Sequence, residues 1–425
     1  MSAKNEGRHG CAGAARTLGG LGGDVGAPNK NEESMMRLAL MAITLLLAAF
    51  SAGASSAGAQ APPIRIGFAS AMSGPAAITG EGVRWGATLA VEEINAKGGV
   101  MGRKIEAFFA DNKAQPGEAV SAVRKLADVD QVDVIIGQTH SGACLGAMPV
   151  VKEIGVPMVI EACSHPKIRE LSGKGGNEWT FRVALDDEIM AHTFARYMAR
   201  QSVKTSSVFA MNNDFGRGAA VAYEAAFKKA GITLVSTEFF DPGQPDYRPV
   251  LTRLKRANPE TILAVILASD GAPFMRQYRE LGLTQRIYSR GSLASAEFLH
   301  QVRDNPKIGD GVVEAGYWVT GLDPDWDKKW TERYKVPPRI HGSLAAITLK
   351  WAVVPAIEIA LKKQGHADRQ TIRAALKEVD VKDSPLGPIK FDDHHQAWIN
   401  MILLEMRDGQ LRILEKLPTS PALLN

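Results

Sequence analysis

The sequence predicts an α/β protein with two doubly wound lobes, each a mostly parallel sheet flanked by helices. Short apolar runs alternate with stretches of helical periodicity along most of the chain. These runs are rich in Val and Ile and do not alternate with polar residues, which is typical of parallel strands buried on both faces. The alternation forms two series of βα units, and 425 residues suffice for two domains of about 150 residues each.

The first series begins at an apolar run, residues 64–69, which ends at Ser73-Gly74-Pro75. The next apolar residues, from Val83 to Ile94, have helical spacing, and Gly98-Gly99 ends that helix. The same patterns predict strands at 104–110, 134–137 and 156–162 and helices at 117–127 and 143–153.

A connecting strand at 179–184 precedes the second series. Asp186 and Asp187 can cap a helix with Met190 and Phe194 on its inner face. The patterns that follow predict strands at 207–211, 232–239, 261–267, 286–290 and 312–319, and helices at 218–230, 247–257, 273–281, 325–334 and 343–363. Residues 389–392, 398–406 and 411–415 are expected to form a terminal β-ribbon that turns at Asp408-Gly409.

The first 59 residues are expected to be a leader that is removed. Residues 1–34 have no periodicity and are typical of a disordered extension or of a start assigned too early. Arg37, the apolar residues 38–50 and Ala57-Gly58-Ala59 then form the three parts of a secretory signal, with cleavage after Ala59. The alternative is a membrane anchor, but thirteen helical residues span only about 20 Å.

Composition and motifs exclude several classes of function. Lys+Arg 50 against Asp+Glu 46 gives a formal charge of +4 without long runs of one sign, so binding to nucleic acid by bulk charge has no support. The sequence has no metalloprotease, esterase or phosphate-loop motif, and the glycines between Gly80 and Gly86 begin too far after their strand for a dinucleotide loop. We therefore expect no enzyme activity and no cofactor.

Two neighbouring strand ends in the first lobe carry hydroxyl groups. Residues 136–142 lead from a strand into a helix, so Ser141 and free backbone N–H groups can converge on an anion. Residues 162–166, after the next strand, add Ser164. Together they suit a carboxylate, although both serines can equally be plain helix caps.

The chain from residue 64 to residue 415 resembles the periplasmic amino-acid-binding proteins of ABC importers, in particular the Leu/Ile/Val-binding type. The matching stretches are IRIGFASAMSGPAAITGEGVRWGATLAVEEINAKGGVMGRKIE, DVIIGQTHSGA, GVPMVIEACS, MNNDFGRG, RQYRELGL and LGPIKFDD. The resemblance implies two lobes, 62–183 with 313–385 and 184–312 with 386–417, joined by three chain crossings and closing on one small ligand.

The resemblance also implies the site residues. Ser141 would bind the ligand carboxylate, helped by the backbone of Ala162 and by the backbone and hydroxyl of Ser164. Thr79, in the Ser-Gly-Pro loop, stands where relatives often have an aromatic side chain. Phe215 stands where relatives often place a tyrosine over the ligand, with ordinary core packing as the alternative.

One departure concerns the ligand. Relatives that bind amino acids hold the ammonium with a carboxylate at the strand end that matches 286–290, where this chain has Arg290. An arginine pairs with a carboxylate and not with an ammonium. Asp270 or Asp186 can replace the missing acid, unless they are a solvated loop residue and a helix cap. A small carboxylate is thus slightly favoured over a branched-chain amino acid, with aromatic acids and amides also open.

Cys144 and Cys163 follow the same two strand ends and can form a disulfide in an oxidising compartment, the alternative being two buried thiols. His140 and His165 lie beside them, but we expect no metal site. The predicted function is that of a monomeric periplasmic solute-binding protein that delivers its ligand to a membrane permease. An exported sensor module is the main alternative, and an exported hydrolase is a distant one.

Overall fold

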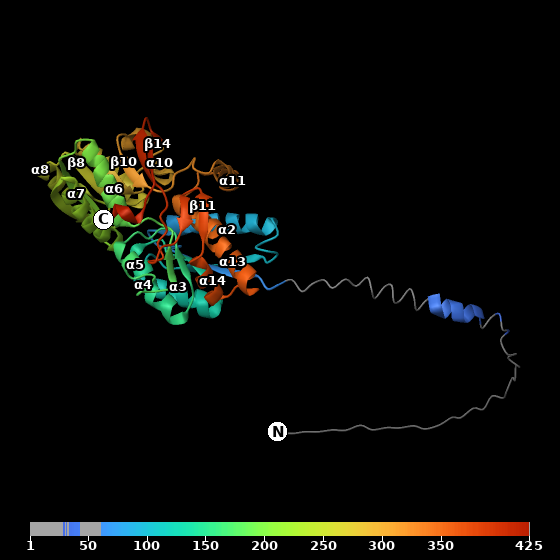
Figure 1. Cartoon of the computed structure of the whole chain (residues 1–425). Coiled ribbons are helices and arrows are strands. Elements are labelled where there is room, and N and C mark those ends of the chain that lie inside the picture. The colour runs from blue at the N-terminus through green and yellow to red at the C-terminus, as the bar shows by residue number, and fades with distance from the viewer. Residues whose placement is uncertain (1–28, 30, 32–33, 43–60, 425) are drawn as a thin grey trace, which may run out of the picture. The chain divides into compact units, whose positions relative to one another are not determined.

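The computed structural model describes residues 29, 31, 34–42 and 61–424. Residues 34–42 are helical, whereas the predicted cleavage site at 57–59 lies outside the described residues. Residues 61–424 form the two-lobed α/β fold that the sequence predicts (Figure 1). Each lobe is centred on one sheet with helices on both faces, so the sheets decide where the strand ends meet.

The first lobe has a five-stranded sheet in the order β2-β1-β3-β4-β5, in which all pairs are parallel. Its strands are β1 (Ile64–Ser70), β2 (Ile105–Asp111), β3 (Val134–Gly137), β4 (Met158–Ile160) and β5 (Thr180–Arg182). Its helices are α2 (Ala77–Ala96), α3 (Pro116–Arg124), α4 (Ser141–Ile154) and α5 (Pro166–Glu170). A π-helical turn, Lys125–Val129, extends α3.

The second lobe has a seven-stranded sheet in the order β14-β13-β10-β9-β8-β6-β7, in which β13 is antiparallel to both of its neighbours, β10 and β14, and the other pairs are parallel. Its strands are β6 (Thr205–Met211), β7 (Thr233–Phe240), β8 (Thr261–Ile266), β9 (Arg286–Gly291), β10 (Val313–Gly316), β13 (Met401–Arg407) and β14 (Gln410–Leu417). Its helices are α6 (Asp187–Arg200), α7 (Asp214–Ala230), α8 (Arg248–Ala257), α9 (Ala268–Glu280) and α10 (Ala296–Gln301), with 3-10 turns at Pro306–Gly309 and Pro421–Leu423.

After β10 the chain returns to the first lobe. This return contains α11 (Pro324–Tyr334), α12 (Ile340–Thr348), a π-helical turn (Leu349–Val353), α13 (Val354–Gln364) and α14 (Arg369–Leu376). A separate two-stranded sheet, β11 (Asp380–Ser384) with β12 (Gly387–Lys390), follows before the chain crosses again. The chain thus passes between the lobes three times, as the resemblance implies.

Two strand assignments differ from the sequence prediction. Residues 313–316 form β10 of the second sheet, so the return to the first lobe begins after β10 and not at residue 313. The strand expected at 389–392 lies at Gly387–Lys390 and pairs with β11, so it is not part of the terminal ribbon. The ribbon itself turns at Asp408 and Gly409 as predicted, both with positive φ.

Helix packing in the first lobe depends on a close approach of two backbones. A Cβ atom on Gly86 of α2 would lie 2.0 Å from the carbonyl oxygen of Gly342 in α12. Only glycine permits this approach, which packs α12 closely against α2. Within the described residues, Ile340–Gln364 is the one helical stretch long and apolar enough to cross a membrane, and most of it is buried in this core.

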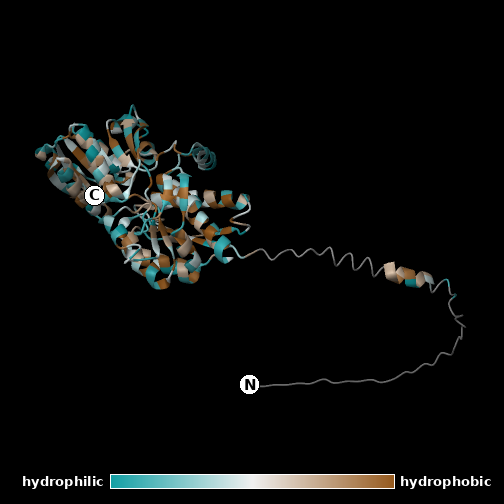
Figure 2. Cartoon of the chain, in the orientation of Figure 1, coloured by the Kyte–Doolittle hydropathy of each residue, from teal (hydrophilic) through white to brown (hydrophobic). Residues whose placement is uncertain are grey.

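The hydrophobic core has three parts that follow the sheet faces. One joins the α2 and α12 side of the first sheet to the α6 and α7 side of the second. The others lie under α8 and α9 in the second lobe and under α3 and α4 in the first. Figure 2 shows hydrophobic residues along the strands and inner helices, whereas α11 is mostly hydrophilic. The sheets are therefore rigid platforms for the loops at their strand ends.

Candidate functional site

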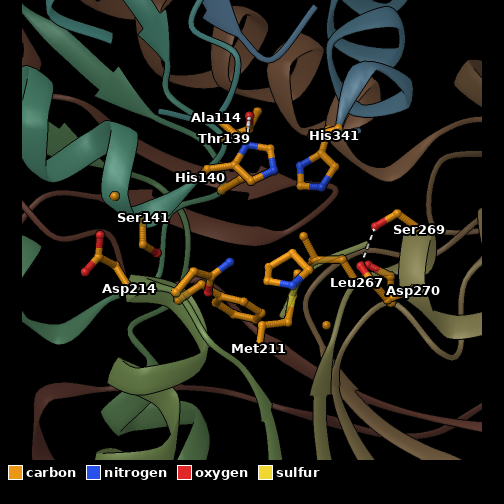
Figure 3. A pocket seen from close by; sticks show the side chains of 18 of the residues that line it. Ala114, Thr139, His140, Ser141, Met211, Asp214, Leu267, Ser269, Asp270 and His341 are labelled. Carbon is orange, nitrogen blue, oxygen red and sulfur yellow. Dashed lines mark hydrogen bonds between the residues drawn. The ribbon is translucent and has the colours of Figure 1, made fainter. Parts of the chain in front are cut away.

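The loops at the carboxyl ends of both sheets enclose a cleft of about 670 Å³ between the lobes (Figure 3). The first lobe contributes residues from the ends of β2, β3 and β4 and from the start of α12. The second lobe contributes the ends of β6, β8, β9 and β10. This is where ligands bind in parallel α/β sheets, and the volume is in the range of small-molecule sites.

The start of α4 points a free hydroxyl at this cleft. Ser141 is the first residue of α4, and His140 precedes it in an extended conformation. The Ser141 side chain is 2% exposed, and its Oγ has no hydrogen-bond partner in the described part of the chain. A buried hydroxyl without a partner is costly, so this atom is a strong candidate for a ligand contact.

The two lobes touch beside this serine. Asp214, the first residue of α7, lies against the first turn of α4, because a Cβ atom on Gly142 would be 2.5 Å from Asp214 Oδ2. On the other side of the same interface, a Cβ atom on Gly218 of α7 would lie 2.6 Å from the His165 ring. The cleft is therefore enclosed at the α4 and α7 edge.

Five of the seven predicted site residues line the cleft: Ser141, Ala162, Phe215, Asp270 and Arg290. Phe215 is partly buried, and the Arg290 guanidinium carbon lies 5.4 Å from the centre of its ring. This contact joins a residue that follows β6 to one at the end of β9, on either side of β8, into one wall of the cleft. Their predicted role in ligand binding remains a prediction.

The other two predicted residues do not reach this cleft. Thr79 belongs to the first turn of α2, not to the loop before it, and lines a smaller hollow that adjoins the cleft. Ser164 is buried, and its hydroxyl donates a 2.8 Å hydrogen bond to Asp187. The Ser164 Oγ is thus directed to the start of α6 and away from the cleft, because the buried Asp187 carboxylate needs a hydrogen-bond donor.

Arg290 has a partner that the sequence prediction missed. Its Nε donates to Asp187 Oδ1 at 2.9 Å, and the Asp187 side chain is fully buried. Burial lowers the pKa of Arg290, but the combined effect of Asp187, Tyr317 and Tyr223 outweighs burial, so the pKa is raised. Burial likewise raises the pKa of Asp187 against the effect of Arg290 and Ser164.

Asp186, considered as a replacement acid, is instead a helix cap. Its Oδ1 accepts from the backbone N–H of Glu188, and its Oδ2 accepts from Arg182 at 2.7 Å and Arg169 at 3.1 Å. This carboxylate is fully buried and does not line the cleft. The plainer interpretation of Asp186 is therefore the one that the structure supports.

Asp270 does line the cleft and is tightly held. Its Oδ1 accepts from the Tyr247 hydroxyl at 2.6 Å and from the Gly243 N–H at 2.7 Å, and its Oδ2 accepts from Ser269 at 3.0 Å. Burial, followed by Asp270 itself, raises the pKa of Tyr247, so its hydroxyl remains a donor. Three donors from its own lobe satisfy much of this carboxylate.

Two histidines face the cleft opposite Asp270 (Figure 3). Burial lowers the pKa of His140 to about 4 and that of His341 to about 3, so both imidazoles are neutral at pH 7. Thr139 bonds Nδ1 of His140 at 3.0 Å, whereas Nδ1 of His341 has no partner in the described structure. His341 enters from α12, and no local pattern in the sequence indicated it.

Cys144 and Cys163 form a disulfide with Cα atoms 6.5 Å apart. The bond ties the first turn of α4, which carries Ser141, to the loop after β4, which carries Ala162. His, Cys, Asp and Glu side chains form no group of three suited to a metal ion within the described ranges. The site therefore consists of hydroxyl, guanidinium, imidazole and carboxylate groups around an apolar interior.

Comparison with known proteins agrees with this geometry. A sequence profile described as periplasmic binding protein matches residues 63–410. Leu/Ile/Val-binding protein homolog 3 of Brucella melitensis is 31% identical over 349 residues, which cover 81% of this chain and 91% of that protein.

Two solved structures have similar folds. The branched-chain amino acid transporter substrate-binding protein LivJ of Streptococcus pneumoniae, in complex with isoleucine, has a TM-score of 0.73 and 22% identity, covering 84% of this chain and 100% of that one. An ABC transporter solute-binding protein of R. palustris, in complex with benzoate, has a TM-score of 0.73 and 20% identity, covering 84% and 97%.

Proposed function

Because the chain belongs to the periplasmic binding protein family, we propose that it captures a small carboxylic acid in the cleft between its lobes and delivers it to the membrane permease of an ABC importer. The family implies export to the periplasm, and we propose that the leader is removed after Ala59. The protein acts as a monomeric binding component, and its relatives are binding proteins and not enzymes.

The observation that carries this proposal is the buried, unpartnered hydroxyl of Ser141. It stands at the amino end of α4, where the first backbone N–H groups have no helical acceptor and the helix dipole favours a negative charge. A ligand carboxylate placed here accepts from the hydroxyl and from these N–H groups. No charged partner is needed for that contact.

The second lobe supports an acid that lacks an amino group. Arg290 uses only Nε for Asp187, so its two terminal amino groups remain as donors to the cleft. Asp270, the carboxylate that could hold an ammonium, already accepts three hydrogen bonds. Donors thus outnumber free acceptors, and the Phe215 ring offers an apolar surface to the body of the ligand.

An amino acid is the second candidate, and the place of Asp270 in the cleft wall favours it. A carboxylate that accepts three hydrogen bonds still has unused lone pairs and can accept from an ammonium group. LivJ holds isoleucine and the R. palustris protein holds benzoate, so both ligand classes occur on this fold.

Delivery follows from lobe closure. A ligand that contacts Ser141 from one lobe and Arg290 from the other stabilises only the closed arrangement, so occupancy is converted into a shape that a permease can recognise. The close approach of Asp214 to Gly142 supports this arrangement, because it brings the two lobes together beside Ser141.

A thermal-shift screen tests the proposal. The mature protein is unfolded and refolded under oxidising conditions to remove ligand carried from the cell. It is then screened against benzoate and related aromatic acids, aliphatic acids and branched-chain amino acids. A ligand at 100 times its Kd adds about 2.7 kcal/mol to the free energy of unfolding, so the melting temperature rises.

We expect acids without an amino group to stabilise the wild type and S141A to lose most of that effect. Thr139→Ser provides a control in the cleft lining, because it changes a residue near Ser141 and keeps a hydroxyl group. If no acid or amino acid stabilises the protein, the proposed function is wrong.

A further inference from the structure

Arg290 is the buried cation of the cleft wall, and Asp187 compensates its charge. The Arg290 and Asp187 side chains are 7% and 0% exposed, and Arg290 Nε lies 2.9 Å from Asp187 Oδ1. Within the described residues, this is the only ion pair that Arg290 forms. Of the two, only Arg290 lines the cleft. A ligand therefore meets the guanidinium, whereas the charge it experiences depends on a residue behind the wall.

The position of Asp187 is fixed from both lobes. Its Oδ2 accepts from the Ser164 hydroxyl at 2.8 Å, and its backbone N–H donates to the Ser164 carbonyl at 2.9 Å. Asp187 is also the first residue of α6, where the helix dipole favours an anion. Three independent interactions thus hold the carboxylate against Arg290.

Other charged groups do not take over this role. Glu314 is buried near Arg290, but its Oε2 accepts from Ser289 and from the Ala294 N–H. Lys113 and Arg217 line the cleft with exposed side chains, so water screens their charge. Asp270 also lines the cleft and is 2% exposed, but it adds negative charge to the wall. Arg290 is therefore the buried positive charge that a second carboxylate could meet, and Asp187 compensates it.

We propose that Asp187 is a specificity-determining residue that neutralises Arg290 and thereby restricts the cleft to acids with a single negative charge. This inference rests on the proposed function, because it concerns which acids are admitted. A second carboxylate would lose its hydration inside the cleft without meeting a free positive charge, which is unfavourable. A single carboxylate, in contrast, is satisfied by Ser141 and the start of α4.

The test changes the wall charge by one unit in each direction. D187N leaves Arg290 uncompensated, R290Q leaves Asp187 uncompensated, and D187N/R290Q removes both charges. Isothermal titration at pH 7.5 compares benzoate with phthalate, its counterpart with two carboxylates. S164A is the matched control, because it removes a hydrogen bond to Asp187 without changing any charge.

We expect the wild type and S164A to prefer benzoate. D187N should raise the affinity for phthalate relative to benzoate by about tenfold or more, since a full charge then faces the ligand at short range. R290Q should weaken the binding of both ligands and lower the ratio of phthalate affinity to benzoate affinity below that of the wild type. The double variant should return this ratio to the wild-type value.

An unchanged ratio in folded D187N overturns the inference. If circular dichroism shows that D187N does not fold, R290Q and the double variant test the inference instead. The inference is then wrong if both variants have the same ratio of phthalate affinity to benzoate affinity as the wild type. Failure of the proposed function has a different result, because the wild type then binds no acid of either kind.

Discussion

Cys144, in the first turn of α4, is joined by a disulfide to Cys163, which follows β4. The bond therefore connects two strand ends of the first lobe that both contribute to the ligand cleft through Ser141 and Ala162. Its removal should affect stability and ligand binding together.

We expect the double variant C144S/C163S to unfold at a lower temperature than the wild type. A disulfide that closes a loop of this length contributes about 3 kcal/mol, and ligand affinity should fall severalfold because Ser141 and Ala162 are less well fixed. Thermal unfolding and titration with the bound acid measure both effects. Dithiothreitol should reproduce them in the wild type and change nothing in the variant, and an equal affinity in all samples would contradict the prediction.

Glu161 should make the protein less stable as the pH rises. It follows β4, both carboxylate oxygens are buried without a hydrogen-bond partner in the described structure, and burial raises its pKa to about 8. A carboxyl group with a raised pKa binds its proton more tightly in the folded protein. Its contribution to stability is thus present below its ordinary pKa of 4.5 and is lost as the pH rises to about 8.

E161Q keeps the shape of the protonated acid and does not titrate. Its free energy of unfolding, relative to the wild type, should rise between pH 6.5 and pH 8 and then level off. Denaturant unfolding in this window avoids the pH range in which the buried His140 and His341 contribute. A difference between the two proteins that does not depend on pH would show that Glu161 titrates normally.

Gly86 should tolerate no side chain. A Cβ atom there would lie 2.0 Å from the backbone oxygen of Gly342, so G86A must separate α2 from α12. Overpacking of this kind costs about 1–3 kcal/mol. Gly117, in α3, is the matched control, because nothing lies within 4 Å of an added Cβ atom and G117A should be neutral or slightly stabilising. Urea unfolding compares the two, and equal stabilities would contradict the packing that we describe.

The fold could be predicted from the sequence because its periodicities are long and regular. The sequence prediction missed four short elements: α5, α10, α14 and β11. The helix α10, for example, has six residues and one fully buried side chain, Phe298, so it has no repeated apolar face to detect. Such segments are helical because of the contacts around them.

The lining of the cleft could be predicted where a strand end supplies the residue, as with Ser141 and Arg290. The adjacent pair Asp186 and Asp187 shows why the rest could not. Asp186 has an extended backbone and caps α6, whereas Asp187 is the first helical residue, and its side chain pairs with Arg290. Sequence alone does not say which of two neighbouring acids is the cap. His341 comes from a distant helix, and only the tertiary fold brings it to the cleft.

The class of ligand can be decided at Asp270. If the ligand has no amino group, as we propose, D270N should leave its affinity within about threefold of the wild type, because an uncharged amide at this position removes no ligand contact. The same variant should lose about 1–3 kcal/mol of stability, since Tyr247, Gly243 and Ser269 donate to this carboxylate.

Y247F is the control for Asp270, because it removes one of these donors and keeps the negative charge. Titration of both variants with the ligand identified in the thermal-shift screen gives the answer. If D270N abolishes binding while Y247F retains it, Asp270 holds an ammonium group and the ligand is an amino acid. If both variants bind like the wild type, the carboxylate is structural, and the ligand is recognised by Ser141, the start of α4 and Arg290.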